Sequence, residues 1–204
     1  MDININTQSS IKINNYYFDP FMIKDESHDA EIIFITHSHY DHFDINSINN
    51  IRNDNTKIVV PRDEEILNKL DFGDNNILIV EPNCNYEINN IKFSTVPSYN
   101  TNKSFHKKEY NWVGYIVSIE GITSYIMGDT DDIDESHNVK CDYLFIPIGG
   151  TYTMDYLEAS KLCNLIKPKE VFPIHYGSIV GDFEDGNKFK ELITPDIKVN
   201  ILLH

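Results

Sequence analysis

Cysteine is scarce in this sequence. Its three cysteines, Cys84, Cys141 and Cys163, are odd in number and widely spaced. No two of them have the spacing of a zinc knuckle or of a redox-active pair. A disulfide framework is therefore not expected, and we expect reduced, mostly buried thiols, as in a cytosolic protein.

Long apolar runs are also lacking. No stretch approaches the roughly 20 apolar residues that a membrane-spanning helix needs. The first residues, Met1-Asp2-Ile3-Asn4, have neither the basic nor the apolar segment of a signal peptide. We therefore expect a cytoplasmic protein with no membrane partner.

Positive charge is in short supply. The chain has 17 Lys and Arg residues against 32 Asp and Glu residues, a net charge of −15. Proteins that bind nucleic acid or anionic membranes rely on clustered Lys and Arg. The charge therefore argues against a nucleic-acid partner and against docking on a lipid surface, and favours a small-molecule substrate.

The 204 residues, 41% of them hydrophobic, suit a single domain over residues 1–204 that buries a normal core. Short β-branched runs alternate with turn residues and a few amphipathic segments. Strands are predicted at 3–5, 11–13, 16–18, 31–36, 57–60, 77–80, 86–88, 91–96, 113–119, 124–127, 143–148, 171–174 and 198–203. Helices are predicted after Asp44 and over 63–70, 155–166 and 185–192. This order favours two sheets packed face to face with helices outside, rather than a doubly wound parallel sheet.

The densest chemical signal is the run Thr36-His37-Ser38-His39-Tyr40-Asp41-His42, which follows a predicted buried strand. His37 and His39 share one side of an extended strand end. A turn after His39 would bring Asp41 and His42 to the same space. Imidazole and carboxylate ligands together suit zinc, iron or manganese. A polar loop with solvated histidines is the alternative, and this density of ligand types disfavours it.

Two other predicted strands end in the same residue types. Gly128-Asp129-Thr130 follows 124–127, and His175-Tyr176-Gly177 follows 171–174. Alone, Asp129 is read as a turn residue and His175 as a hydrogen-bonded or surface residue. Together, three strand ends that carry ligand-type side chains predict one metal site.

The pattern His37-x-His39-x-Asp41-His42 resembles the signature of metallo-β-lactamase-fold hydrolases. Gly128-Asp129-Thr130 resembles that family's bridging aspartate segment, and His175 its late histidine. The resemblance covers nearly the whole chain and is strongest to the branch of ascorbate-6-phosphate lactonase-like proteins. Supporting segments are Phe18-Asp19-Pro20, residues 146–154 and Pro173-Ile174-His175-Tyr176.

The resemblance implies an α+β fold, a four-layer αβ/βα sandwich with metals at one edge between the sheets. It implies two divalent metal ions, Zn first, with Mn or Fe as alternatives. His37 and His39 would hold the first ion. Asp41, His42 and His175 would hold the second, and Asp129 would bridge the two. The lactonase-like relatives also suggest a homo-oligomer.

One segment departs from the family pattern. The family usually supplies another histidine to the first ion shortly after the strand that corresponds to 91–96. Asn100 stands in that place here, and Asn is a poor zinc ligand. His106 follows a few residues later. We favour His106 as the ligand, with a surface His106 and a weaker first site as the alternative.

The mechanism implied is hydrolysis by a metal-bound hydroxide, with Asp41 and Asp129 orienting it and Asp41 accepting a proton. Asp19 is expected to hydrogen-bond a histidine ligand, or else to be a turn residue. Predicted substrate contacts are Tyr99, Asn100, Thr151, Tyr152 and Tyr176. The segment 149–153 could receive an anionic group.

The loop 101–111 carries Lys103, Lys107 and Lys108. It is read either as a lid that brings positive charge toward an acidic substrate or as a solvated loop.

The leading function is therefore hydrolysis of a small ester, lactone or phosphoester that could be anionic. The alternatives are a phosphodiesterase acting on nucleic acid or lipid, an iron-dependent oxygen or redox enzyme, and a non-catalytic metal-binding module. The net charge disfavours nucleic acid, and the chain has no room for an added flavin domain. The intact set of Asp41, Asp129 and His175 disfavours a decayed site.

Overall fold

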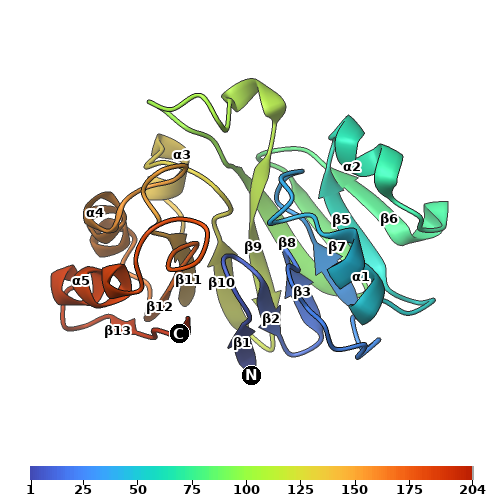
Figure 1. Ribbon diagram of the computed structural model, residues 1–204, viewed down its shortest axis with the longest axis horizontal. Helices are drawn as coiled ribbons and strands as arrows, with labels where there is room; N and C mark the ends of the chain where they lie inside the picture. The colour runs from blue at the N-terminus through green and yellow to red at the C-terminus, as the bar shows by residue number, and fades with distance from the viewer. Residues whose placement is uncertain (204) are drawn as a thin grey trace.

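The strands form two sheets that lie face to face, and the computed structural model describes residues 1–203 (Figure 1). The first sheet has the order β1-β2-β3-β4-β5-β6, and the second has the order β13-β12-β11-β10-β9-β8-β7. The strands of the first sheet are β1 (Ile3–Ile5), β2 (Ile11–Ile13), β3 (Tyr16–Phe18), β4 (Ile32–Phe34), β5 (Lys57–Pro61) and β6 (Ile77–Val80). Those of the second are β7 (Asn85–Ile88), β8 (Ile91–Pro97), β9 (Val113–Ile119), β10 (Ile122–Ile126), β11 (Tyr143–Pro147), β12 (Glu170–Ile174) and β13 (Lys198–Val199).

Both sheets are mixed. In the first, β1, β2 and β3 pair antiparallel and β3 to β6 pair parallel. In the second, β7 to β10 are antiparallel hairpins and β10 to β13 are parallel. Parallel neighbours end at the same edge of their sheet, so the loops that follow β10 and β12 share one edge of the second sheet. The loop that follows β4 lies at the facing edge of the first sheet.

Helices cover the outer faces. The helices are α1 (Ile45–Ile51), α2 (Glu64–Lys69), α3 (Asp134–His137), α4 (Tyr156–Ile166) and α5 (Glu184–Leu192). Two short 3-10 turns lie at Asp74–Asn76 and Lys108–Tyr110. Figure 1 shows α1 and α2 beside the first sheet and α4 and α5 beside the second.

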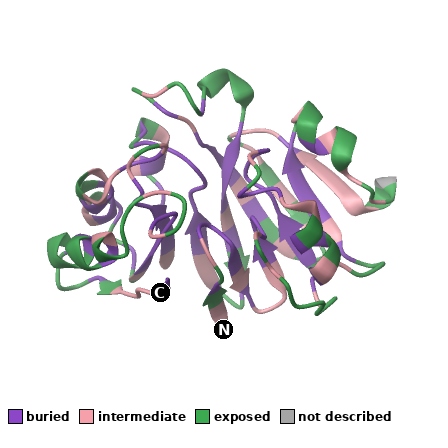
Figure 2. Ribbon diagram, in the orientation of Figure 1, coloured by how far each residue is buried: buried purple, intermediate pink, exposed green. Residues whose placement is uncertain are grey.

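Successive side chains of a strand point to opposite faces of its sheet, and this places apolar residues both between the sheets and under the helices. In β4, Ile32 and Phe34 pack into the cluster between the sheets, whereas Ile33 packs with Ile48 of α1 and Ile66 of α2 on the outer face. Both faces of β4 are thus buried, as Figure 2 shows for the central strands. The four-layer αβ/βα sandwich expected from the sequence is confirmed.

Most predicted elements are present, with small shifts at their ends. Asp44 caps α1, and its side chain accepts a hydrogen bond from the amide of Asn46. The turn at Asn89 and Asn90 has positive φ angles of 50° and 64°, as the predicted tight hairpin requires. The last strand is shorter than predicted, since it covers Lys198–Val199 instead of 198–203. Helix α3 was not predicted, because four residues are too few to show a helical period.

The two sheets are joined at the edge where these loops gather. The Tyr115 hydroxyl of β9 donates a 2.6 Å hydrogen bond to the Ile35 carbonyl just after β4. The amide of Val113 donates to the Thr36 carbonyl at 3.3 Å. This edge is therefore held in register across the sandwich. Among the described residues, no helix is both long and apolar enough to cross a bilayer.

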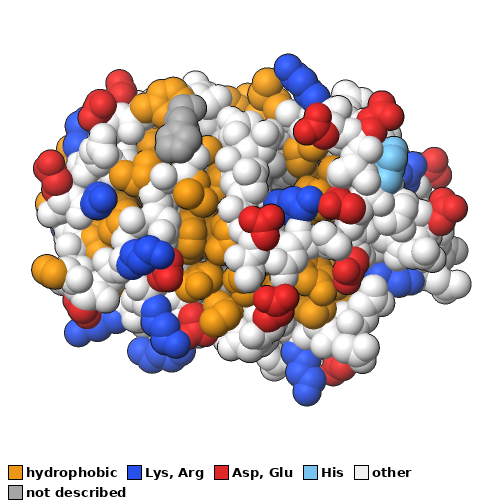
Figure 3. All heavy atoms as spheres, turned by 90° about the horizontal axis from the view of Figure 1, so that it is seen from below, with side chains coloured by type: hydrophobic (Ala, Val, Ile, Leu, Met, Phe, Trp, Pro, Cys, Tyr) orange, Lys and Arg blue, Asp and Glu red, His pale blue; other side chains and the backbone are white. Residues whose placement is uncertain are grey.

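The opposite end of the sandwich carries the N-terminus (Figure 1). Seen from that side, apolar side chains emerge among acidic and basic groups that are interspersed rather than gathered by sign (Figure 3).

Candidate metal centre

Four connections bring the predicted ligands to one place. The connection from β4 to α1 carries His37, His39, Asp41 and His42, the loop between β8 and β9 carries His106, and Asp129 and His175 follow β10 and β12. Apart from His39, which is partly exposed, these side chains are buried. The structure therefore assembles the seven residues predicted as ligands from four separate parts of the chain.

Asp129 lies at the middle of this group and is 3% exposed. Its Oδ2 lies 3.1 Å from His175 Nε2 and 3.3 Å from His106 Nε2. Its Oδ1 lies 3.3 Å from His42 Nε2. One carboxylate thus faces histidines of both predicted metal sites, as a bridging ligand would.

Three sets of side chains have geometry suited to an ion. In each set the ligand atoms lie within 4.8 Å of one another. The sets are His37, His39 and His106; His37, His42 and Asp129; and Asp41, His42 and His175. The first and third correspond to the two sites that the family resemblance implies, and the second links them through Asp129.

Several ligand atoms in this group are buried without a hydrogen-bond partner among the described residues. They are Nε2 of His42, His106 and His175, and Oδ1 of Asp129. A buried polar atom that is left unpaired costs free energy of about 1–3 kcal/mol. Imidazole nitrogens and a carboxylate oxygen that converge in this way fit a divalent cation such as zinc, manganese or iron.

Asp19 supports His42 from behind. Its Oδ2 lies 2.8 Å from His42 Nδ1, and the same carboxylate accepts hydrogen bonds from the amide of Thr36 at 2.7 Å and its hydroxyl at 2.6 Å. A carboxylate on Nδ1 fixes the ring and leaves Nε2 free for an ion. The predicted contact of Asp19 with a histidine ligand is confirmed.

Asn100 supports His106 in a similar way. Its Oδ1 accepts from the His106 backbone amide and from His106 Nδ1, each at 3.1 Å. Its Nδ2 donates to the Tyr152 carbonyl at 2.9 Å and to Asp131. The structure therefore places His106 with His37 and His39, and it places Asn100 behind His106, where it orients the ring.

The backbone on either side of the group is unusual. Gly128 has a φ of +67°, and a Cβ there would lie 3.1 Å from Thr36 Cβ. The missing side chain lets the end of β10 approach the end of β4 and sets Asp129 beside His37. His175 also has a positive φ, 58°, which is held in part by a 2.9 Å hydrogen bond from its amide to the Gln8 carbonyl. A non-glycine residue in this region is strained, and such strain is concentrated at functional sites.

Burial and neighbouring charge set the protonation of the group in the absence of an ion. Burial and the charge of His42 hold the pKa of His37 well below its usual range. Burial alone would lower the pKa of His42, but Asp129 and Asp19 raise it well above that range. Burial opposes the shift at Asp41, yet the nearby His175 ring and the charge of His42 hold the Asp41 pKa at about 2. Protons and metal ions therefore compete for the same lone pairs.

Trp112, the single tryptophan of the chain, packs against the first histidine set. Its ring centroid lies 4.7 Å from that of His37, 5.0 Å from that of His39 and 5.6 Å from that of His106. Its indole Nε1 donates a 2.8 Å hydrogen bond to Asp63. Trp112 was not among the predicted site residues. Its position between a polar loop and an apolar strand was the available signal.

The predicted substrate contacts separate into two groups. Tyr152 lines a cavity of about 250 Å³ in front of the histidines. The other lining residues are His39, Tyr40, Asp41, Phe105, Asp129 and Ile179. Thr151 is exposed beside this cavity and does not line it. The Tyr99 hydroxyl binds Glu135 at 3.0 Å, away from the cavity.

Tyr176 is 1% exposed, and its hydroxyl points at α5, where a Cβ on Gly186 would lie 2.5 Å away. It packs beneath the helix and does not line the cavity. Sequence reasoning missed the contributions of Tyr40, Phe105 and Ile179 to the cavity wall. Phe105 and Ile179 carry no polar group, so nothing in their residue type marks them as site residues.

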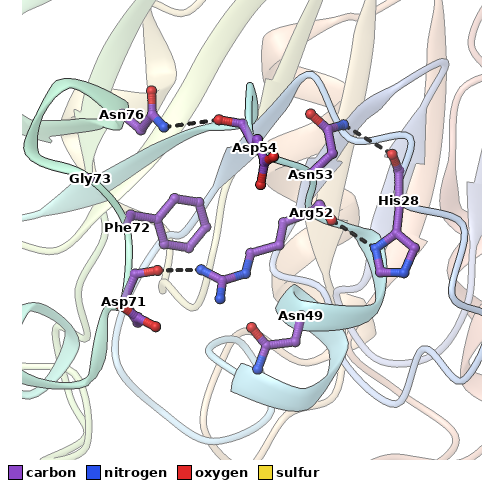
Figure 4. Close-up of a pocket in the computed structure, with 9 residues that line it drawn as sticks. All are labelled: His28, Asn49, Arg52, Asn53, Asp54, Asp71, Phe72, Gly73 and Asn76. Atoms are coloured by element: carbon purple, nitrogen blue, oxygen red, sulfur yellow. Dashed lines mark hydrogen bonds between the residues drawn. The ribbon is translucent and has the colours of Figure 1, made fainter.

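A larger cavity, about 670 Å³, lies between the end of α1 and the loop after α2 (Figure 4). The Arg52 side chain crosses it, stacks over the Phe72 ring at 4.8 Å and donates to the Asp71 carbonyl. The His28 ring binds the Arg52 carbonyl. The Arg52 and His28 side chains thus bind backbone groups of the cavity wall, and the cavity contains none of the three candidate ligand sets.

Known proteins resemble this chain in sequence and in fold. A family model described as the beta-lactamase superfamily domain matches residues 8–175. A UPF0173 metal-dependent hydrolase of Thermococcus onnurineus is 31% identical over 199 residues, which cover 90% of this chain and 87% of that protein. The structure of a presumed metal-dependent hydrolase from Parabacteroides distasonis has a TM-score of 0.83 and 29% identity over 99% of this chain and 93% of the other.

The fold is shared more widely than the sequence. CmlA, a diiron β-hydroxylase of Streptomyces venezuelae, has a TM-score of 0.75 and 12% identity, covering 99% of this chain and 52% of that one. Such a likeness shows the fold alone.

Proposed function

The chain belongs to the beta-lactamase superfamily, and from that premise we propose that it is a metal-dependent hydrolase of a small ester, lactone or phosphoester. The proposal includes two divalent cations, Zn first, with Mn or Fe as alternatives. The cytoplasmic location, the small-molecule partner and the homo-oligomer stay predictions from the sequence.

One observation carries the proposal. Nε2 of His42, His106 and His175 and Oδ1 of Asp129 are buried, converge on one another and have no hydrogen-bond partner among the described residues. A site of polar groups that only served the fold would satisfy them internally. Buried ligand atoms left open around Asp129, which lines the cavity, favour a bound cation at this place.

When bound, such cations acidify water and polarise the oxygen of a carbonyl or phosphoryl group. The residues of the chain supply the rest. Asp19 and Asn100 fix the rings of His42 and His106 so that both Nε2 atoms face Asp129. Asp41, which is ionised at neutral pH, lines the cavity and can accept a proton at Oδ2, an atom 3.5 Å from His175 Nε2. Neither a serine nor a cysteine is needed as nucleophile.

The test is a comparison of substrates and metals on the purified protein. We expect Zn²⁺, Mn²⁺ or Fe²⁺ to support hydrolysis of at least one among a γ-lactone, phenyl acetate, phenyl phosphate and a phosphodiester, and EDTA to abolish it. Metal-independent turnover, or no turnover of any of these with any of the three metals, would contradict the proposal.

A further inference from the structure

Large apolar side chains surround the mouth of the 250 Å³ cavity. Tyr40 is 66% exposed, Phe105 45% and Ile179 39%, and Tyr152 stacks edge-on against Phe105 with ring centroids 4.7 Å apart. These four residues, called here the apolar rim, come from four different loops. Exposed apolar side chains that gather around a concave site mark a surface that binds apolar groups.

Two of the three lysines of the 101–111 loop are already paired with carboxylates. Lys103 binds Asp131 at 2.6 Å, and Lys108 binds Glu135 at 2.9 Å. Of the two readings of the 101–111 loop, a lid that brings positive charge to an acidic substrate is the less favoured, because carboxylates of the protein already pair with Lys103 and Lys108. Among the residues that line the cavity, none is a lysine or an arginine.

The backbone amides at the N-terminus of α4 are already hydrogen-bonded by a capping side chain. The Asp155 carboxylate accepts hydrogen bonds from the amides of Leu157 and Glu158, and the Glu158 side chain binds back to the Asp155 amide. An anionic group that reached the segment 149–153 would find this helix terminus already occupied by a carboxylate of the protein. An anionic tail of a substrate would therefore meet no lysine or arginine among the described residues that line this cavity.

Resting on the hydrolase function proposed above, we propose that the substrate is an uncharged ester or lactone whose acyl or ring substituent, several carbons long, packs against the apolar rim. In the reaction, water adds to the acyl carbon and the acyl carbon–oxygen bond breaks. The water oxygen stays on the acyl carbon, one proton passes to the departing alkoxide, and the carboxylic acid product ionises. A lactone gives one hydroxy acid, and an ester gives an acid and an alcohol.

The experiment uses the metal-loaded protein and three γ-lactones that share one scissile bond. They are γ-butyrolactone, γ-nonanolactone with its pentyl chain, and the analogue of the latter whose chain ends in a carboxylate in place of the methyl group. Because each methylene that leaves water contributes about 0.8 kcal/mol, we expect kcat/KM for γ-nonanolactone to exceed that for γ-butyrolactone at least about tenfold. The carboxylate analogue should lose most of that gain.

Variants of the apolar rim test whether the preference for the pentyl chain arises at this surface. Ile179→Ala and Phe105→Ala should each reduce the preference for the pentyl chain about fivefold, since each removes part of the apolar contact. Leu165→Ala is the matched control, because Leu165 is 52% exposed on the outer side of α4 and does not line the cavity. It should leave the preference as in the parent protein.

The outcomes separate this inference from the function on which it rests. Three results would overturn the inference and leave the hydrolase function standing. They are equal kcat/KM for the short and long lactones, a higher kcat/KM for the carboxylate analogue, and metal-dependent hydrolysis of phosphoesters alone. A chain-length preference that survives both rim variants would also overturn it. Absence of metal-dependent turnover of every substrate in the wider comparison would overturn the function itself.

Discussion

Asp129→Asn is expected to reduce metal-dependent hydrolysis by about three orders of magnitude, which corresponds to about 4 kcal/mol of transition-state stabilisation. Asp129 is the one carboxylate that faces His42, His106 and His175 within 3.1 to 3.3 Å. Asparagine keeps the shape but removes the charge and one anionic oxygen, so it is a poor bridge between cations. Initial rates at saturating metal and the bound-metal content after dialysis measure the two effects together.

The matched control is Asp134→Ala. Asp134 has the same side chain and begins α3, where its carboxylate is fully exposed. It should leave both the rate and the metal content unchanged. An Asp129→Asn protein that binds as much metal as the parent and retains more than about a tenth of its rate would show that Asp129 does not join the two histidine sets.

Gly114→Ala is expected to destabilise the fold by about 3 kcal/mol. A Cβ at Gly114 of β9 would lie 2.7 Å from the carbonyl oxygens of Ile126 and Met127. These are backbone atoms, so no side-chain rotation can relieve the contact. The end of β10, which leads directly into Gly128 and Asp129, would have to move. We therefore expect a lower urea midpoint and weaker metal binding in the same variant.

Gly73→Ala is the control for this effect. No atom lies within 4 Å of a Cβ at Gly73, and its φ of −60° suits any residue. Alanine there restricts the unfolded chain and should leave stability unchanged or raise it by about 0.5 kcal/mol. Equal urea midpoints for the parent, Gly114→Ala and Gly73→Ala would contradict the close approach of β9 to the end of β10.

Strands and helices could be predicted wherever the local residue pattern was typical of only one kind of element. The runs that became β4 and β9 are rich in β-branched and aromatic residues, and Asp44 stands where a helix cap belongs. The end of the chain was less clear. Residues 198–203 read as a strand, but only Lys198 and Val199 pair with β12. Pairing at a sheet edge depends on the partner strand, which a local pattern does not contain.

The site was predictable in its ligand types and less so in its supporting contacts. His37 and Asp41 stand in a dense run, so their proximity follows from the sequence. His106 faces the other histidines, whereas Asn100, which stands in the place of the family's histidine, orients the His106 ring. This arrangement depends on a loop that folds back until the Asn100 side-chain amide meets the His106 ring. Residue spacing alone could not decide which of the two turns toward the histidines. The pairing of Lys103 with Asp131 joins positions 28 residues apart, so its charge could not be assigned from its place in a loop.

The wall of the cavity was the least predictable part. Phe105 and Ile179 are ordinary apolar residues in the sequence, and their role comes only from the meeting of two loops at one mouth. Trp112 shows the same limit, since its contact with His37 spans the junction between the two sheets. Predicting such positions requires the tertiary structure, because neither residue type nor period identifies them.

The central claim is that side chains from four connections cage divalent cations between the two sheets. Anomalous scattering at the zinc absorption edge, from crystals grown with Zn²⁺, tests it most directly. We expect density peaks within bonding distance, about 2.0–2.2 Å, of Nε2 of His106 and Nε2 of His175, with Asp129 between them. A map with no peak among these three side chains would contradict it.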